Sequence, residues 1–351
     1  MSAARRSVLS GVVALALLGA ALLLAAGGVR GQPAGNLELL PGEYLWLPEL
    51  SPRGPVLVLV SLPEQRAYVY RNGVRIGVAT VSTGKPGFET PTGVFTILQK
   101  KREHYSNLYD DAPMPFMQRL TWDGVAMHAG RVPGYPASHG CVRLPQAFSE
   151  KLFDVTERGM TVVIVDQANR APLLADPAVF PMAPSGALPS STPVGQLQQP
   201  AMPEAGYTWA PERAPPGALT VVVSVRDREV VVVREGIEIG RGPVQVAAGV
   251  PAGTRAYLLL EGTQADASPV LPDRPRRRWL HVHGDGATDD DPARLAGALV
   301  VAPGFARAVY DAMTPGTSLV VTDEPLGSES PITVMESQAP AAAVDSGSDA
   351  E

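Results

Sequence analysis

A single cysteine stands among the 351 residues, and its neighbours could make it reactive. Cys141 lies in the segment Ser-His-Gly-Cys-Val-Arg at residues 138–143, and a further histidine, His128, lies upstream. A thiol becomes a useful nucleophile when a neighbouring base takes its proton, and histidine suits this role near neutral pH. The pattern therefore predicts a cysteine nucleophile with His128 as its general base, and the alternative is an inert buried thiol.

The loop around the thiol offers further groups for acyl transfer. An acyl intermediate needs hydrogen-bond donors for its oxyanion, and the backbone N–H groups of His139, Gly140 and Cys141 are the candidates. Gly140 allows close approach to the backbone, and the Ser138 hydroxyl is expected to brace the loop. The side chain of His139 has two open interpretations, a pocket residue or a structural histidine that hydrogen-bonds within the loop.

The N-terminal residues predict export across a membrane. Arg5 and Arg6 precede an uncharged stretch at 11–29 that is rich in Leu, Ala and Val. Residues 1–31 are therefore expected to be a signal peptide or an uncleaved N-terminal membrane anchor. Exported proteins normally use cysteines in pairs as disulfides, so a lone thiol favours the reactive interpretation.

The composition fits two folded domains with polar flanks. The hydrophobic fraction of 45% is sufficient for real cores, and the length exceeds that of one typical domain. The net charge of −6 and the isoelectric point near 5.5 give no support to a nucleic-acid partner. The composition does not set an oligomeric state.

Residues 55–167 are expected to form the first domain. A β-branched run at 55–61 predicts a buried strand, and Asn72-Gly73 between apolar runs predicts a two-residue hairpin turn. Helical spacing at 148–155, followed by an apolar run at 161–165, predicts a helix and a closing strand.

Residues 218–324 repeat this domain at constant sequence offsets. The segment 234–240 matches 71–77, and Phe305 matches Phe148 at a second offset. That second offset places Ala298 opposite Cys141 and Ala296 opposite His139, while His283 falls opposite His128. The second copy is therefore expected to keep the fold and lack the chemistry.

Three segments flank or join the two domains. Residues 32–54 are expected to be a lead-in to the first domain. Residues 168–217 are rich in Pro and Ala and predict a linker, because such a stretch buries too little apolar surface to fold. Residues 325–351 are acidic and rich in Ala and Ser, and they predict a disordered tail.

Three motifs together resemble a known family. They are Thr-Pro-Thr-Gly-Val-Phe at 90–95, Met-His-Ala at 127–129 and Ser-His-Gly-Cys-Val-Arg-Leu at 138–144. The combination resembles the L,D-transpeptidase catalytic domain (YkuD-type), which cross-links bacterial peptidoglycan. The resemblance covers the first domain fully and the second in degenerate form.

The resemblance implies a fold, an activity and a location. It implies a mainly β protein with two tandem L,D-transpeptidase-like β-sandwich domains in the periplasm or cell envelope of a bacterium. Cys141 would attack the third residue's carbonyl in a stem tetrapeptide, and a second stem's amine would resolve the thioester into a 3→3 cross-link. His128 would be base and acid, the amides around Gly140 the oxyanion hole, and His139 and Arg143 would shape the pocket. No metal or organic cofactor is implied, and a carbapenem is expected to acylate the thiol.

Two departures from the family pattern leave the acceptor open. The interval between His128 and Cys141 is shorter than in many members, which predicts a reduced flap, and Arg143 stands where many members have Asn. An L,D-carboxypeptidase or endopeptidase and a non-catalytic wall-binding protein are the alternative functions.

Other residues carry weaker expectations. Aromatic side chains upstream of His128 are expected either to line the cleft or to pack in the core: Tyr105, Tyr109, Phe116 and Trp122. His281 and His283 lie on one face of an expected strand, where either a metal or a relic of the repeat would explain them. Four arginines at 274–278 suit either an anionic polymer or a solvated loop.

Overall fold

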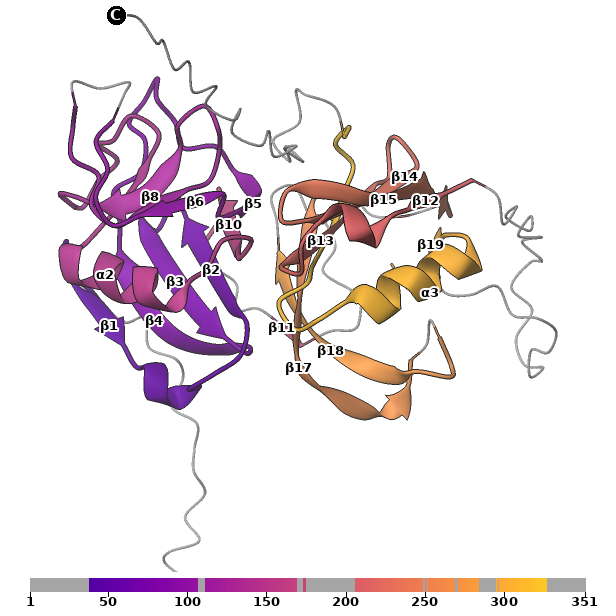
Figure 1. Cartoon of the computed structure of the whole chain (residues 1–351). Coiled ribbons are helices and arrows are strands. Elements are labelled where there is room, and N and C mark those ends of the chain that lie inside the picture. The colour runs from indigo at the N-terminus through magenta and orange to yellow at the C-terminus, as the bar shows by residue number, and fades with distance from the viewer. Residues whose placement is uncertain are drawn as a thin grey trace, which may run out of the picture. The chain divides into compact units, whose positions relative to one another are not determined.

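The computed structural model describes residues 38–106, 111–168, 173–174, 206–248, 250, 252–268, 271–283, 295 and 297–326. The first domain is built on a six-stranded sheet in the order β1-β4-β3-β2-β10-β5 (Figure 1). Its strands are β1 (Tyr44–Trp46), β2 (Val56–Ser61), β3 (Arg66–Arg71), β4 (Val74–Thr80), β5 (Gly93–Thr96) and β10 (Thr161–Val165). The strands and the hairpin turn predicted from residue patterns are confirmed, with Asn72 at φ +48° and Gly73 at φ +83°.

A smaller sheet and one helix complete the first domain. The sheet has the order β6-β7-β8-β9, and the predicted helix is confirmed as α2. The bounds are β6 (Gln99–Lys101), β7 (Met117–Arg119), β8 (Ala126–Ala129), β9 (Val142–Leu144), α2 (Gln146–Val155) and the 3₁₀ helix η1 (Pro48–Leu50).

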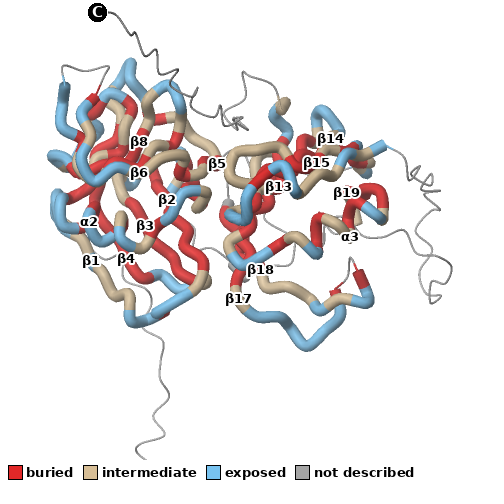
Figure 2. Tube along the Cα trace, viewed as in Figure 1, coloured by how far each residue is buried: buried red, intermediate tan, exposed pale blue. Residues whose placement is uncertain are grey.

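The core of this domain lies between the large sheet, the small sheet and α2. Val58 and Val69 supply side chains from the large sheet, Met127 and Val142 from the small one, and Phe148 from the helix. Figure 2 shows these strands as largely buried. Burying a side chain of this size contributes about 1.5–3 kcal/mol, so the small sheet is held in place by its apolar face.

The second domain has an eight-stranded sheet in the order β11-β18-β17-β20-β13-β14-β15-β12. Its elements are β11 (Leu173–Leu174), β12 (Thr208–Trp209), η2 (Pro211–Arg213), β13 (Leu219–Ser224), β14 (Glu229–Arg234), β15 (Ile237–Pro243), β17 (Arg255–Ala267), β18 (Pro275–His283), α3 (Pro303–Ala312) and β20 (Ser318–Thr322). A separate pair joins β16 (Gln245–Val246) to β19 (Leu299–Val300).

The repeat predicted from sequence offsets is present in the strand pairing. β2, β3 and β4 pair in the same order as β13, β14 and β15, and each set has a bulge at the matching place, after Val69 and after Val232. Gly77 lies against Trp46 and Phe148 in one domain. The equivalent set in the other domain is Gly240, Trp209 and Phe305.

The structure corrects two of the predicted boundaries. The lead-in at 32–54 contains β1, which pairs with β4, so the ordered domain begins before residue 55. The linker at 168–217 contains β11 and β12, which pair with β18 and β15. Trp209 explains the presence of β12, because its large aromatic ring packs against Phe305 and buries enough surface to order a short segment. Residues 1–31 and 327–351 lie outside the described residues.

The second face of the first sheet is buried as well, in a cluster that joins Leu57, Leu59 and Tyr68 with Leu258 and Leu280 of the second sheet. This explains why β2 is apolar at successive positions instead of alternating. Among the described residues, no helix has the length and apolar character that crossing a membrane requires.

Candidate active site

The pairing of β8 with β9 brings the predicted residues together. These strands run parallel, with His128 directly opposite Arg143 and Met127 opposite Val142. Side chains alternate between faces along a strand, so Met127 and Val142 point into the core while His128 and Arg143 share the other face. Cys141 precedes Arg143 by two residues and lies on that same face. The apolar alternation therefore orients the polar residues.

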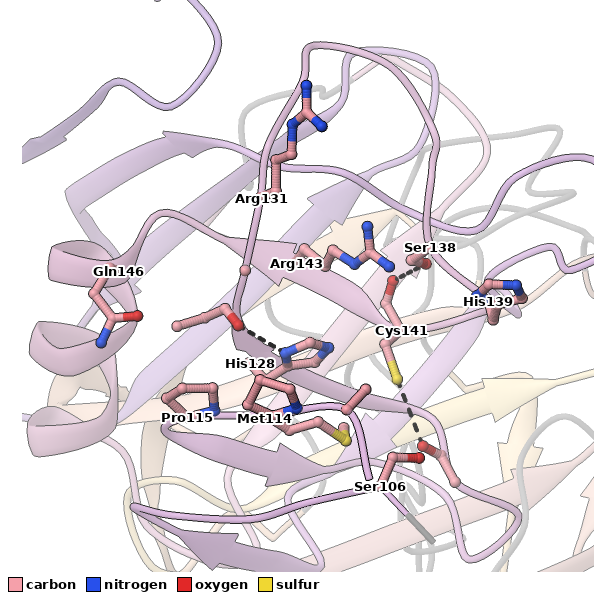
Figure 3. Close-up of a pocket in the computed structure, with 15 residues that line it drawn as sticks. Ser106, Met114, Pro115, His128, Arg131, Ser138, His139, Cys141, Arg143 and Gln146 are labelled. Carbon is pink, nitrogen blue, oxygen red and sulfur yellow. Dashed lines mark hydrogen bonds between the residues drawn. The ribbon is translucent and has the colours of Figure 1, made fainter. Parts of the chain in front are cut away.

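His128 and Cys141 line one cavity of about 510 Å³ (Figure 3). Ser138, His139 and Arg143, all predicted from the sequence, line it as well. Its other walls come from the loop before β7, the turn before β8, the end of β8 with the segment after it, and the start of α2. These residues are Ser106, Ala112, Pro113, Met114, Pro115, Gly124, Ala129, Gly130, Arg131 and Gln146.

The imidazole of His128 is oriented by the backbone. Its Nδ1 lies 2.8 Å from the carbonyl oxygen of Ala129. A carbonyl oxygen only accepts, so Nδ1 carries the proton and Nε2 is left as the acceptor in the neutral ring. Figure 3 shows the opposite edge of the ring facing the side chain of Cys141. The ring is thus held in the tautomer that a general base requires.

Burial keeps both reacting groups neutral. Burial lowers the pKa of His128 to about 4, and the hydrogen bond to Ala129 opposes this only in part. Burial also raises the pKa of the Cys141 thiol above its ordinary value, although the Ala126 backbone and the charge of Arg143 lower it in part. The resting pair is therefore a thiol and an imidazole, and the thiol donates to the Gly124 carbonyl at 3.6 Å.

The loop before the thiol is braced as predicted, but one of its amides is already used. The Ser138 hydroxyl donates to the Cys141 carbonyl at 2.5 Å and accepts the N–H of Gly140 at 3.2 Å. Gly140 adopts φ +105°, a conformation open to glycine and rarely to other residues. The Gly140 N–H, one of the three amides expected to serve the oxyanion, is engaged by Ser138 in this conformation.

His139 lies at the rim of the cavity and not beside the thiol's base. Its ring packs edge-on against Phe88 at 4.7 Å between centroids. The side chain is exposed, whereas His128 is buried. This separation favours the structural interpretation of His139 and leaves His128 as the candidate base.

Arg143 is held over the backbone of a glycine. A Cβ on Gly130 would lie 3.2 Å from Cγ and Cδ of Arg143, so the aliphatic stem fills the space that a side chain would take. Within the described part of the chain, no carboxylate lies within 4.0 Å of this guanidinium. Its positive charge therefore acts on the cavity without being neutralised.

Four aromatic residues were expected either to line the cleft or to pack in the core, and those that the structure describes do not line the cavity. Tyr105 and Trp122 are exposed, and Phe116 packs against Phe153 at 5.9 Å between centroids. Tyr109 lies outside the described residues. Arg131 and Gln146 line the cavity without having been predicted. Arg131 follows His128 by three residues, and this proximity in sequence is the one feature that could have predicted its place in the cavity.

Among the described residues of the second domain, an alanine stands at the position that corresponds to Cys141. Ala298 precedes β19 as Cys141 precedes β9, and Gly297 keeps a positive φ of +75° where Gly140 stands in the first domain. The strand that ends at His283 belongs to the large sheet and pairs with β17. The two turns therefore share a glycine with positive φ, and alanine takes the place of the cysteine in the second domain.

The arginines at 274–278 are engaged by groups of their own domain. Arg274 pairs with Asp311 at 3.0 Å and Arg277 donates to the carbonyl of Tyr310. Arg278 donates to the carbonyl of Glu261. These contacts favour a structural role over a site for anionic polymer. The predicted solvated loop is wrong, because Arg276, Arg277 and Arg278 lie in β18. His281 is buried and stacks on Tyr257 at 4.7 Å, and the described residues hold no cluster of three metal-binding side chains.

Comparison with known proteins finds one family model that matches the first domain. Residues 55–165 match the family model of the L,D-transpeptidase catalytic domain, YkuD. This is the family that the three sequence motifs resemble. No curated protein sequence matches the chain.

Solved structures give likenesses over about a third of the chain. An L,D-transpeptidase from Mycobacterium smegmatis is 25% identical, with a TM-score of 0.31, over 33% of this chain and 59% of that one. One from Stackebrandtia nassauensis is 30% identical, with a TM-score of 0.29, over 34% and 57%. LdtMt1 in complex with imipenem is 25% identical, with a TM-score of 0.30, over 32% and 59%. The chain thus spans less than two thirds of the length of each.

Proposed function

We propose, from the match of residues 55–165 to the L,D-transpeptidase catalytic domain, that this protein cross-links peptidoglycan stem peptides through a thioester on Cys141. The observation that carries the proposal is the pairing of Cys141 with a neutral, correctly oriented His128 in one cavity. The proposed location is the cell envelope, where the expected export segment would deliver the domain.

In the first half-reaction, Sγ of Cys141 attacks the carbonyl of the third stem residue as its proton passes to Nε2 of His128. The carbonyl oxygen becomes an oxyanion, which needs donors in the loop. The C–N bond to the terminal D-alanine then breaks, and His128 returns the proton to the departing amine. The products are free D-alanine and a thioester.

In the second half-reaction, an amine of another stem attacks the thioester. His128 takes a proton from that amine, and the thiol leaves and recovers its proton. A neutral His128 suits both halves, because a base whose pKa is about 4 stays unprotonated at neutral pH until the nucleophile delivers its proton. A low basicity limits the driving force, so alignment in the cavity has to supply part of the rate.

The direct test incubates the full chain with purified disaccharide-tetrapeptide and identifies the products by mass. We expect a cross-linked dimer that has lost one D-alanine, and no dimer with the Cys141→Ala variant. Tripeptide without dimer would mean that water resolves the thioester, and the function would then be hydrolysis. Unchanged substrate with the wild-type chain would contradict both.

A further inference from the structure

Thr90 is a buried residue that connects two distant loops at the active site. Its hydroxyl donates to the carbonyl oxygen of Gly140 at 2.8 Å and accepts the N–H of Gly84 at 2.8 Å. The residue is only 4% exposed, so no water competes for these bonds. Thr90 belongs to one of the sequence motifs, but its spacing there indicated no role.

The bond to Gly140 fixes the peptide plane next to the nucleophile. The Gly140 carbonyl and the Cys141 N–H belong to one peptide unit, which is planar and trans, so they point in opposite directions. Holding the carbonyl toward Thr90 therefore turns the Cys141 N–H away from Thr90. In the described part of the chain, no acceptor is found for this N–H.

The peptide unit between Gly140 and Cys141 needs a hydrogen bond to fix its orientation, because it follows a glycine. Gly140 has φ +105°, and glycine imposes little steric preference on the adjacent peptide units. The Gly140 N–H is held on the preceding side by Ser138. On the following side, the hydroxyl of Thr90 is the group that holds the carbonyl.

The loop that carries Thr90 is itself tightly closed. A Cβ on Gly84 would lie 1.9 Å from the Phe88 carbonyl oxygen and 2.6 Å from the Thr90 nitrogen, so a side chain does not fit there. The N–H of Lys85 donates to the Ser138 carbonyl at 3.0 Å, which ties the same loop to the start of the nucleophile segment. Thr90 therefore lies in a rigid loop, and its hydrogen bond holds the carbonyl of Gly140 in place.

We propose that Thr90 is a positioning residue that aims the Cys141 N–H at the oxyanion of the acyl intermediate. This rests on the proposed function, because only acyl transfer builds such an oxyanion. In the second domain, the Pro-x-Gly turn before the strand that pairs with β20 reads Val-Pro-Ala-Gly at 250–253. The second domain therefore lacks both the threonine and the cysteine at these positions, as expected if Thr90 serves the reaction of Cys141.

The test compares two reactions of Cys141 in the full chain. Acylation by imipenem passes through an oxyanion, whereas alkylation by iodoacetamide displaces iodide at a saturated carbon and forms none. We expect Thr90→Val to slow acylation about 10- to 100-fold and to leave alkylation unchanged. Thr90→Ser keeps the hydroxyl and should restore most of the acylation rate. Thr92→Val is the matched control in the same turn and should react like the wild type.

The outcomes separate this inference from the proposed function. Equal acylation of wild type and Thr90→Val would overturn the inference alone. Slowing of both reactions by Thr90→Val would also overturn it, because Thr90 would then act on the thiol or on the fold. A wild-type chain that imipenem does not acylate would overturn the proposed function and this inference with it.

Discussion

His128 and Arg143 are direct partners across the parallel strands β8 and β9. The guanidinium of Arg143 lowers the pKa of His128 and, in part, that of Cys141. A nearby cation opposes a second positive charge and favours a negative one. Arg143 thus helps to keep His128 available as a base while it makes the thiolate easier to form.

Replacing Arg143 by Gln should raise the pKa of Cys141 further, because the thiolate loses a nearby positive charge. At a fixed pH near neutrality, we expect alkylation by iodoacetamide to slow about two- to tenfold. The measurement is the alkylation rate of the full chain against pH. Arg131→Gln is the control, since Arg131 lines the same cavity but does not affect either pKa. Equal shifts in both variants would assign the effect to the whole cavity.

Replacing Cys141 by Ser should abolish the covalent imipenem adduct, because a hydroxyl is a far poorer nucleophile at neutral pH. Cys141 is the single cysteine of the chain, so mass spectrometry of the intact protein should show one adduct in the wild type and none in the variant. Circular dichroism should confirm that both chains are folded. An adduct that persists in Cys141→Ser would place the reactive group elsewhere.

Replacing His128 by Ala should slow imipenem acylation far more than replacing His139. His128 receives the thiol proton, and general acid–base catalysis of this kind is worth about 10²- to 10⁴-fold. His139 contacts Phe88 at the rim, so His139→Ala should cost about tenfold or less. Acylation rates of the two variants at pH 7 provide the comparison. A larger loss in His139→Ala would reverse the two roles.

The stability of the protein should depend on pH through His128. Its pKa is about 4 in the folded chain and 6.5 as an ordinary histidine, so the unfolded chain binds the proton more readily. Neutral His128 therefore contributes up to about 3 kcal/mol to the free energy of unfolding. This contribution is fully present above pH 6.5 and is lost as the pH falls through 4. Denaturant unfolding at several pH values should show a smaller acid loss in His128→Gln. The same loss in both chains would exclude His128 as its source.

The paired glycines of the two domains should respond alike to substitution. A Cβ at Gly77 would lie 2.7 Å from Cε3 of Trp46, and one at Gly240 would lie 2.6 Å from Cε3 of Trp209. We expect Gly77→Ala and Gly240→Ala each to lower the free energy of unfolding by about 1–3 kcal/mol, because a packed ring must move. Gly206→Ala, with 3.8 Å to its nearest contact, is the control and should have little effect. If Gly240→Ala left the free energy of unfolding unchanged, the packing of Trp209 against Phe305 would be loose.

The sequence alone predicted the repeat and the candidate pair of Cys141 and His128, which the structure places in one cavity. Local patterns suffice for both, because a nucleophile and its base are recognised by residue type and because duplicated segments keep their spacing. The strands at Val56–Ser61 and Thr161–Val165 followed from their β-branched runs. The shared face of His128 and Cys141 followed once β8 and β9 were known to pair in parallel.

Only the tertiary structure decided which backbone groups are free to act. Gly140 gives its N–H to Ser138 and its carbonyl to Thr90, which lies 50 residues earlier in the chain. The tautomer of His128 depends in the same way on a single carbonyl, that of Ala129. Residue types do not reveal which partner a backbone group takes, because every residue except proline carries the same backbone donor and acceptor. The contacts formed in the folded chain determine these partners.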